Sequence, residues 1–269
     1  MTVETSEAEM PTASQASRSA ALEIYASSGR RIDAPIRRRF VRSDSASRPS
    51  PMISIYRGGR GGDVAIRLYV ALIWRSARPP FDSTESAAAW ATLLDLDDPT
   101  GNGARRVRAA LKKLSSAKLI RIETDPGRVS RIVLLREDGS GKSYQLPSTA
   151  FTAARGNRRD VHRYFKVPTN LWLDGQFQSL SGPALVMLMI FLAEQGAEGK
   201  EVWFSVSVFQ ERYGISSATR SAGTKELRAR GLLVETSEKL GGRSGFPNTV
   251  FGAPIQRRKV YKLTGAARL

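Results

Sequence analysis

The side chains that most often carry enzymatic chemistry are scarce in this sequence. Among its 269 residues there is no cysteine, and the single histidine is His162. The chain therefore has no thiol nucleophile, no disulfide framework and no His/Cys set of the kind that holds zinc. His162 lies in the polar stretch 159–163, where a solvated linker side chain is the simpler interpretation. We therefore expect no metal site, no cofactor and no catalytic residue.

One short motif resembles the end of a nucleotide-binding loop but lacks the required context. Residues 139–143 read Gly-Ser-Gly-Lys-Ser, yet Arg136 stands where the first glycine of a P-loop belongs. A strand-like sequence follows at residues 144–147, in place of the helix that such a loop needs. The acidic residues of the chain have no base at a useful spacing for acid–base catalysis. The sequence thus predicts a protein that is not an enzyme and indicates no small-molecule ligand.

Positive charge, in contrast, is abundant. Lys and Arg total 42, Asp and Glu total 25, and the formal net charge is +17, which favours a polyanionic partner. The longest apolar run, residues 184–193, is too short to cross a bilayer, which needs about 20 apolar residues. The first thirty residues show no secretory signal pattern. We therefore expect a cytoplasmic protein with a polyanionic partner, for which nucleic acid is favoured over a membrane.

Residues 104–118 form the most informative basic segment, because they include no acidic residue. Apolar side chains recur there at the i, i+3, i+4 and i+7 spacing of one buried helix face, namely Val107, Ala110, Leu111 and Leu114. The exposed face and its margins then carry Arg105, Arg106, Arg108, Lys112 and Lys113. Such a face suits contact with phosphates and guanine edges. We expect the acidic run at residues 95–98 to turn away or to cap this helix.

The elements that must position this helix occur twice in the chain. The first copy has helical patterns at residues 64–74, 84–94 and 104–114, followed by strand patterns at 119–122 and 131–135. The second has helices at 185–193, 206–213 and 217–230, a short strand at 202–204, and strands from 232 and at 259–263. Leu114 then corresponds to Leu227, and Tyr144 to Tyr261. We also expect an extended segment before each copy, at residues 52–56 and 163–167.

Three helices followed by a hairpin resemble the winged-helix variant of the helix-turn-helix, found in DNA-binding proteins of bacteria, plasmids and phages. In that family the third helix enters the major groove and the hairpin, or wing, touches the backbone or the minor groove. The most specific part of the resemblance is residues 226–233, where Gly231 permits a left-handed helix end. Lys118 replaces this glycine in the first copy. In the second copy Arg220, Gly223 and Thr224 occupy helix positions where apolar residues are expected.

The resemblance implies an α+β fold with two winged-helix domains in tandem, at residues 52–147 and 161–265. Residues 148–160 would form the linker, and residues 1–51 a disordered basic arm, because their composition buries little apolar surface. The arginines of the arm could follow a phosphate backbone or enter a minor groove. Five candidate DNA contacts lie on the third helix of the first copy. The remaining candidates come from the two wings, the third helix of the second copy and the arm. They are Arg128, Arg131, Ser217, Thr219, Arg220, Ser221, Lys225, Arg228, Arg243, Arg257, Arg258, Arg37, Arg38 and Arg39.

The resemblance implies a nucleoid-associated protein whose partner is double-stranded DNA and not a membrane, and three roles are compatible with it. A transcription regulator is the first, and a plasmid or phage replication initiator is the second, since some initiators also pair two winged helices. A protein of chromosome or plasmid segregation, or of a nucleoid assembly, is the third. RNA binding would favour aromatic stacking platforms, which the outward helix faces lack. Two modules in one chain could read adjacent half-sites without a partner subunit, and a homodimer stays open as the alternative.

Overall fold

The computed structural model describes residues 12–28, 33–43, 48–57, 61–195, 200–239 and 257–268, with the backbone alone at 206–208 and 239. Helices dominate, and the strands form three small sheets. The α+β class expected from the sequence is therefore confirmed. Among these residues no helix is both long and apolar enough to cross a membrane.

The first unit, defined here as α3 to β4, contains three helices and a small antiparallel sheet. Its strands follow the order β2-β4-β3, so that the first and last strands of the unit are neighbours. Val107, Ala110 and Leu114 are buried as expected, and Leu111 is half-buried. The elements are α3 (Gly62–Arg75), β2 (Asp82–Ser83), α4 (Ala87–Leu93), α5 (Asn102–Ser116), β3 (Ile120–Glu123) and β4 (Arg131–Leu134).

The second unit, α9 to β7, repeats this order of elements. Val202 forms an isolated bridge with Tyr261 of β7, as β2 pairs with β4 in the first unit. The counterpart of Tyr261 is therefore a residue of β4, and its expected match with Tyr144 is wrong, because Tyr144 lies beyond the hairpin in no strand. The elements are α9 (Gly182–Gln195), α10 (Val206–Tyr213), α11 (Ser217–Ala229), β6 (Leu233–Lys239) and β7 (Arg257–Leu263).

The N-terminal segment is structured where it is described, so the prediction of a disordered arm is wrong for residues 12–28 and 33–43. Helix α1 (Gln15–Ser27) packs on α4, and the Ser17 hydroxyl donates to the Leu93 carbonyl at 2.7 Å in a buried contact. Strand β1 (Ala34–Arg37) pairs antiparallel with β5 (Tyr164–Val167). The segment contributes Ala21, Ile36, Phe40 and Val41 to the core, and a distant strand supplies the hydrogen bonds of β1.

The segments around the units also depart in part from expectation. The stretch at 52–56 belongs to helix α2 (Pro51–Arg57) and is not extended, whereas the one at 163–167 is strand β5, as expected. Most of the expected linker is helical, in α6 (Pro147–Ala153) and η2 (Gly156–His162). The other short helices are η1 (Arg38–Phe40), α7 (Asn170–Leu173), α8 (Gln176–Ser179) and η3 (Gly265–Ala267).

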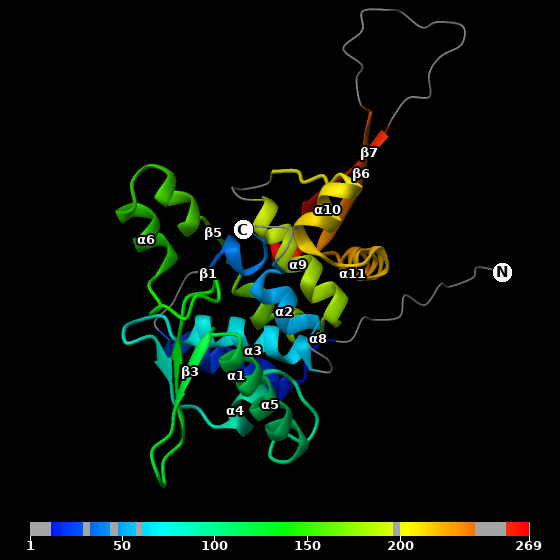
Figure 1. The fold of residues 1–269 in the computed structure, drawn as a ribbon. Coiled ribbons are helices and arrows are strands. Elements are labelled where there is room, and N and C mark those ends of the chain that lie inside the picture. Colours follow the sequence, from blue (N-terminus) through cyan, green and yellow to red (C-terminus); the bar gives the residue numbers. More distant parts are fainter. Residues whose placement is uncertain are drawn as a thin grey trace, which may run out of the picture.

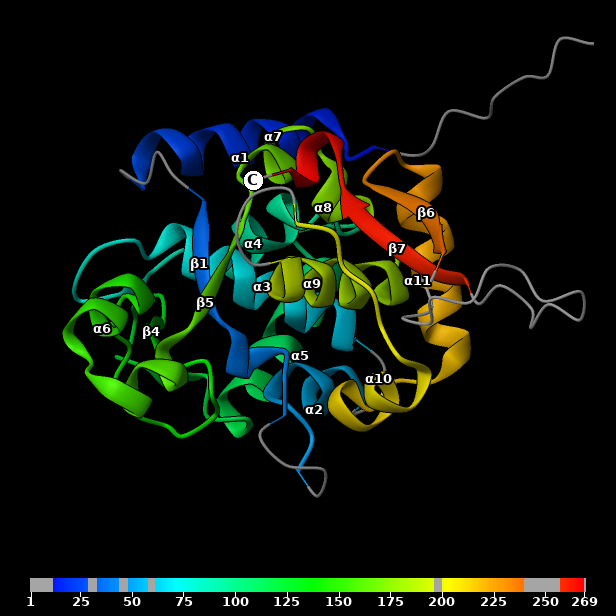
Figure 2. The ribbon, with the colours of Figure 1, turned by 90° about the horizontal axis from the view of Figure 1, so that it is seen from above.

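The two units share one hydrophobic core, in which α3 and α9 occupy the middle (Figure 2). The rings of Trp74 and Trp172 stack with centroids 5.5 Å apart. The guanidinium of buried Arg67 in α3 donates to the Leu180 carbonyl, just before α9, at 2.8 Å. The hairpins β3–β4 and β6–β7 extend from opposite ends of the molecule (Figure 1). The shared core therefore fixes the relative placement of both third helices, α5 and α11.

Candidate nucleic-acid interface

Helix α5 is held at its N-terminus by the acidic turn before it. The Asp98 carboxylate accepts hydrogen bonds from the amides of Gly101 at 3.2 Å and Asn102 at 2.7 Å. These amides have no partner within the helix, so the carboxylate stabilises the helix start. The expectation that the acidic run caps this helix is confirmed for Asp98. Asp95 instead accepts hydrogen bonds from the amide and hydroxyl of Ser14, which precedes α1.

The outward face of α5 is basic, as expected. Arg105, Arg108 and Lys112 are exposed, and Arg106 and Lys113 are half-buried at its edge. A hollow of about 500 Å³ opens beside this edge and is lined by Arg105, Arg106 and Lys113. This volume is within the usual range for small-ligand pockets, about 300–1,000 Å³. The Lys113 ammonium is buried there without a hydrogen-bond partner in the described part of the chain. Within the described residues, this end of the unit therefore offers cations for which no carboxylate partner is found.

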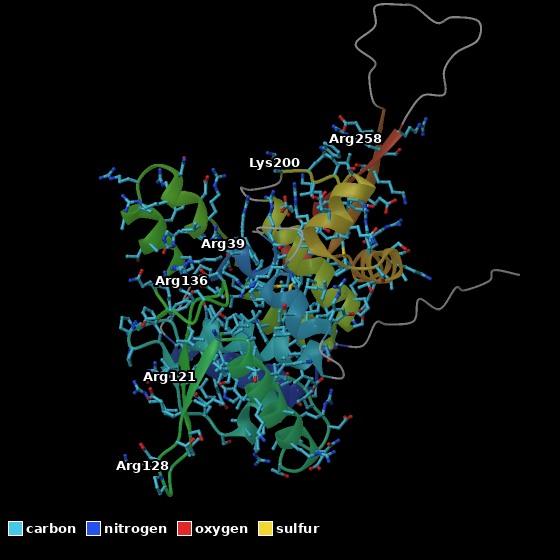
Figure 3. The ribbon with its side chains drawn as sticks, in the orientation of Figure 1. Arg39, Arg121, Arg128, Arg136, Lys200 and Arg258 are labelled. Atoms are coloured by element: carbon cyan, nitrogen blue, oxygen red, sulfur yellow. The ribbon has the colours of Figure 1, made fainter. Side chains whose placement is uncertain are left out.

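The β3–β4 hairpin contributes one exposed candidate and one that is engaged within the protein. Arg128 is exposed at the end of the hairpin (Figure 3). Arg131 pairs with Asp82 of β2 and with Glu123 of β3, the latter at 3.1 Å. These carboxylates raise the pKa of Arg131. Arg131 therefore holds the three-stranded sheet together, and Arg128 is the candidate that is available to a partner.

Helix α11 lies unusually close to α9, and this explains the glycine at an apolar position. A Cβ built on Gly223 would lie 2.3 Å from the Pro183 carbonyl oxygen and 2.7 Å from the Met187 Cγ, so only glycine fits. Arg220 lies over the rings of Phe209 and Phe204, at 4.4 and 5.7 Å from their centroids. A cation over an aromatic face is stabilised by the negative charge density of the ring. Arg220 thus covers the core as an apolar side chain would.

The outward face of α11 is small and polar. Ser217, Ser221 and Lys225 are exposed, as expected. Thr219 is half-buried, and its amide donates to the capping Ser216 hydroxyl at 3.1 Å. Arg228 pairs with Glu235 of β6 at 3.3 Å. This face can therefore approach a partner closely, but it carries less free charge than α5.

The positive charge of the β6–β7 hairpin is also partly neutralised by carboxylates of the protein. Arg257 is exposed, whereas Arg258 pairs with Glu238 at 2.6 Å and lies over the Trp203 ring at 4.9 Å (Figure 3). Trp203 is itself half exposed to solvent. Arg243 lies outside the described residues. Arg257 is therefore the described candidate on this hairpin for which no carboxylate partner is found.

Arg37 is wrongly placed among the candidate contacts, because its side chain is 0% exposed. It pairs with the equally buried Glu137 in the turn after β4, and its Nη2 donates to the Gln145 carbonyl at 3.0 Å. Its Nε donates to His162 Nδ1 at 3.3 Å. His162 is consequently half-buried and not a freely solvated linker residue. A charge pattern cannot distinguish a buried arginine from an exposed one, so this pair could not be predicted from the sequence.

The neighbouring arginines of the same segment are partly accessible. Arg38 and Arg39 are half-buried in η1 and line hollows in the surface together with Arg42. Arg48, Lys118 and Arg163 lie on the same hollows, although sequence reasoning did not select them. The only one of them that the sequence pattern singled out is Lys118, which stands where a glycine is expected at the end of α5. They come from three distant segments and could not be grouped without the fold.

The fold and the site define a mixed α+β protein with two repeated helix–hairpin units, one of which carries a strongly basic helix. Comparison of the chain with models of known protein families, with curated proteins and with solved structures found no match. Within the described ranges, no group of three or more His, Asp or Glu residues is placed to hold a metal ion.

Proposed function

We propose that the protein binds double-stranded DNA with sequence preference through two winged-helix domains in tandem. In support, the first unit has the order helix, strand, helix, helix, strand, strand, and its first strand pairs with its last. The second unit has its three helices and two strands in the same order, with the isolated bridge from Val202 to Tyr261 in place of the first strand. This order is typical of winged helices, in which the third helix enters the major groove. Helices α5 and α11 occupy that third position.

The observation that carries the proposal is the charge of the exposed α5 face. Arg105, Arg108 and Lys112 project from a helix without a single acidic residue, next to a hairpin that ends in exposed Arg128. An ordinary solvated helix mixes both signs of charge. Arginine forms the most common specific contact with guanine, and lysine and arginine neutralise phosphates.

Within this class we propose a transcription regulator. One chain would present two reading helices, so that it could occupy adjacent half-sites without a second subunit. A replication initiator and a segregation or nucleoid-assembly protein are the other outcomes of the test below. The mass of the complex on a single site, measured by analytical ultracentrifugation, distinguishes one bound chain from a homodimer.

Selection of bound fragments from random duplex DNA tests the proposal. At about 0.15 M salt non-specific binding has a Kd of about 10⁻⁴–10⁻⁶ M, and we expect the selected site to bind at least ~10³-fold more tightly. A site beside promoters identifies a regulator, and an array of repeats in an origin identifies an initiator. If no motif is enriched and binding is only weak and salt-sensitive, sequence-specific recognition is excluded and an assembly role is favoured.

The double variant Arg105→Ala/Arg108→Ala tests which helix reads the bases. We expect its affinity for the selected site to fall by about 1–3 kcal/mol for each lost base contact, with a smaller loss on scrambled DNA. Arg155→Ala/Arg158→Ala is the matched control, since it removes two exposed arginines outside α5. Equal losses on both DNAs from both double variants would contradict base reading by α5.

A further inference from the structure

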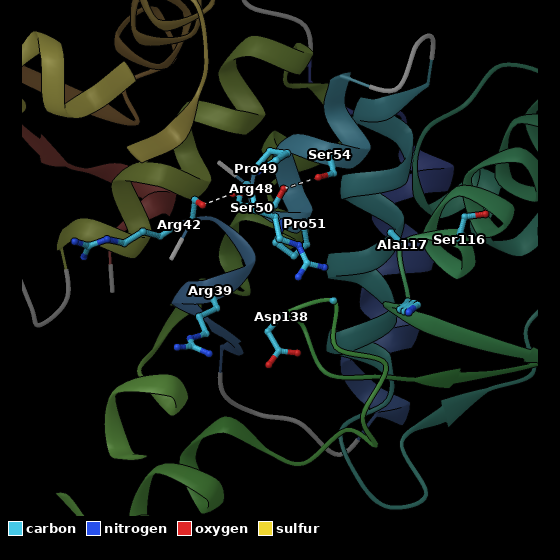
Figure 4. Close-up of a pocket in the computed structure, with 13 residues that line it drawn as sticks. Arg39, Arg42, Arg48, Pro49, Ser50, Pro51, Ser54, Ser116, Ala117 and Asp138 are labelled. Carbon is cyan, nitrogen blue, oxygen red and sulfur yellow. Dashed lines mark hydrogen bonds between the residues drawn. The ribbon is translucent and has the colours of Figure 1, made fainter. Parts of the chain in front are cut away.

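A basic cleft lies where the N-terminal segment crosses the end of α5. It encloses about 450 Å³ between η1, the segment before α2, the C-terminal end of α5 and the turn after β4. A second hollow of about 410 Å³ continues from it and shares Arg39, Arg42 and Ser43. Figure 4 shows the lining side chains, among them Arg39 on η1 and Asp138 in the turn after β4. We call the two hollows together the basic cleft.

Among the described residues that line the basic cleft, cations outnumber carboxylates. The two carboxylates in this part of the lining are each paired, Asp138 with Arg136 and Asp160 with Arg163, the latter at 2.7 Å. Arg42 reaches Glu194 only at 3.9 Å. The cations that line the cleft are Arg38, Arg39, Arg42, Arg48, Lys118 and Arg163. The lining therefore has an excess of positive charge.

Arg38 shows that this charge is incompletely compensated. Its Nε is buried and has no hydrogen-bond partner among the described residues. Burial lowers the pKa of Arg38, and Arg163 and Arg42 lower it further against the opposing effect of Glu194. A buried donor without an acceptor costs free energy that a bound anion would recover.

Lys118 is held in the cleft in a strained conformation. Its φ is +57°, a value that favours glycine, and the second unit has Gly231 at the corresponding helix end with φ +67°. The aliphatic part of Lys118 lies against Gly141, and the residue lines the cleft. The lysine destabilises the helix end but adds a charge to the cleft.

From these four observations we propose that the basic cleft binds a phosphate group, separately from base reading by α5. Phosphate matches several convergent guanidinium and ammonium donors. A volume of about 450 Å³ is within the usual range for small ligands, about 300–1,000 Å³. The phosphate belongs either to a DNA backbone or to a free nucleotide. The first source rests on the proposed function, and the second does not.

The variant Lys118→Gly provides the main test. It removes one cation and relieves the left-handed conformation, so we expect a higher melting temperature together with weaker phosphate binding. Loss of one charge-assisted hydrogen bond corresponds to about 10-fold weaker binding or more. Arg39→Gln is a second variant without the change in backbone. Lys142→Gln is the matched control, because this exposed lysine lies outside the cleft lining.

Two titrations of the full-length protein distinguish the sources. One uses a random-sequence duplex over a series of salt concentrations, and the other uses fluorescent trinitrophenyl-ATP without DNA. Weaker duplex binding with a salt slope reduced by about 0.9 per lost phosphate contact assigns the DNA backbone. A loss with trinitrophenyl-ATP, which inorganic phosphate displaces from the parent protein, assigns a free nucleotide. Equal affinities for parent, both cleft variants and control in both titrations, or no binding by the parent in either, overturn the proposal.

The DNA-fragment selection and the two titrations together distinguish failure of this proposal from failure of the proposed function. Absence of any enriched DNA motif would refute sequence-specific recognition by α5 but would leave both titrations informative. Conversely, Lys118→Gly is expected to keep the sequence preference of the parent, since it lies at the far end of α5 from Arg105.

Discussion

The first unit turns Arg105, Arg108 and Lys112 of α5 toward solvent, whereas the second turns Ala218, Ser221 and Lys225 of α11 outward at the corresponding positions. The two helices thus share a place in their units but differ in two of three outward side chains. A face with three cations attracts a polyanion over a distance, and a face of small side chains lets the backbone approach a surface closely. We infer that α5 would contribute more of the salt-dependent affinity than α11.

The buried sides of the same helices differ as well. Val107 of α5 corresponds to Arg220 of α11, which lies over two aromatic rings, and Ala110 corresponds to Gly223, which lies against the α9 backbone. Helix α11 therefore packs on α9 at a distance that α5 does not require. An equal order of elements can therefore rest on different packing, and in the second unit Gly223 is required by the close approach of α11 to α9.

Breaking the buried contact between the N-terminal segment and the first unit should have the largest effect. Glu137→Gln keeps the side-chain volume but leaves Arg37 buried without a counter-charge, and such a loss costs about 3–5 kcal/mol of unfolding free energy. Because β1 also pairs with β5, which precedes the second unit, we expect the loss to weaken the packing of the two units against each other. Chemical denaturation followed by circular dichroism measures it.

Glu123→Gln is the matched control for Glu137→Gln. Glu123 bonds Arg121 and Arg131 at the surface, where water screens the pairs, so its loss should lower the unfolding free energy far less than Glu137→Gln does. If both variants unfold with the same free energy as the parent, the buried pair does not hold the segment in place. The first unit would then be independent of β1.

A substitution at Gly223 tests the close packing of the second unit. Gly223→Ala places a methyl group against the Pro183 carbonyl, and we expect a loss of about 1–3 kcal/mol of unfolding free energy from this overpacking. Ala222→Gly on the exposed face of the same helix is the control, and it should lose only the helix propensity of about 1 kcal/mol. A gain in stability for Gly223→Ala would show that the higher helix propensity of alanine outweighs any overpacking. Helix α11 would then have enough room beside α9 for a methyl group.

Periodicity was sufficient to predict the repeated elements, because each amphipathic helix buries its own stripe of side chains. It gave α10 over its full length and the buried face of α5, and it located β5. It was wrong for the N-terminal segment and for α2, since their order depends on partners far along the chain. The hydrogen bonds of β1 come from β5, and residues 52–56, which were expected to be extended, form a helix that packs on α3.

The candidate site could be predicted in the same way only where it lies on a single helix. Helical phase placed Arg105, Arg108 and Lys112 at the surface, and the structure agrees. Phase could not show that Arg37 is buried or that Arg131 is paired, because their carboxylate partners are distant in sequence. The grouping of Arg39 with Lys118 required the fold for the same reason.

The smallest effect concerns His162, which lies between the units and accepts a hydrogen bond from Arg37. Burial lowers the pKa of His162, and Arg37 and Arg136 lower it further. Its stabilising contribution is therefore complete above the unfolded pKa, about 6.5, and is lost as the pH falls through the lower folded pKa. His162→Asn keeps an acceptor near Nδ1 but does not titrate. Between about pH 7.5 and 5.5 we expect its melting temperature to fall slightly less than that of the parent. Equal decreases in the two proteins would mean that protonation of His162 does not affect the stability of the fold.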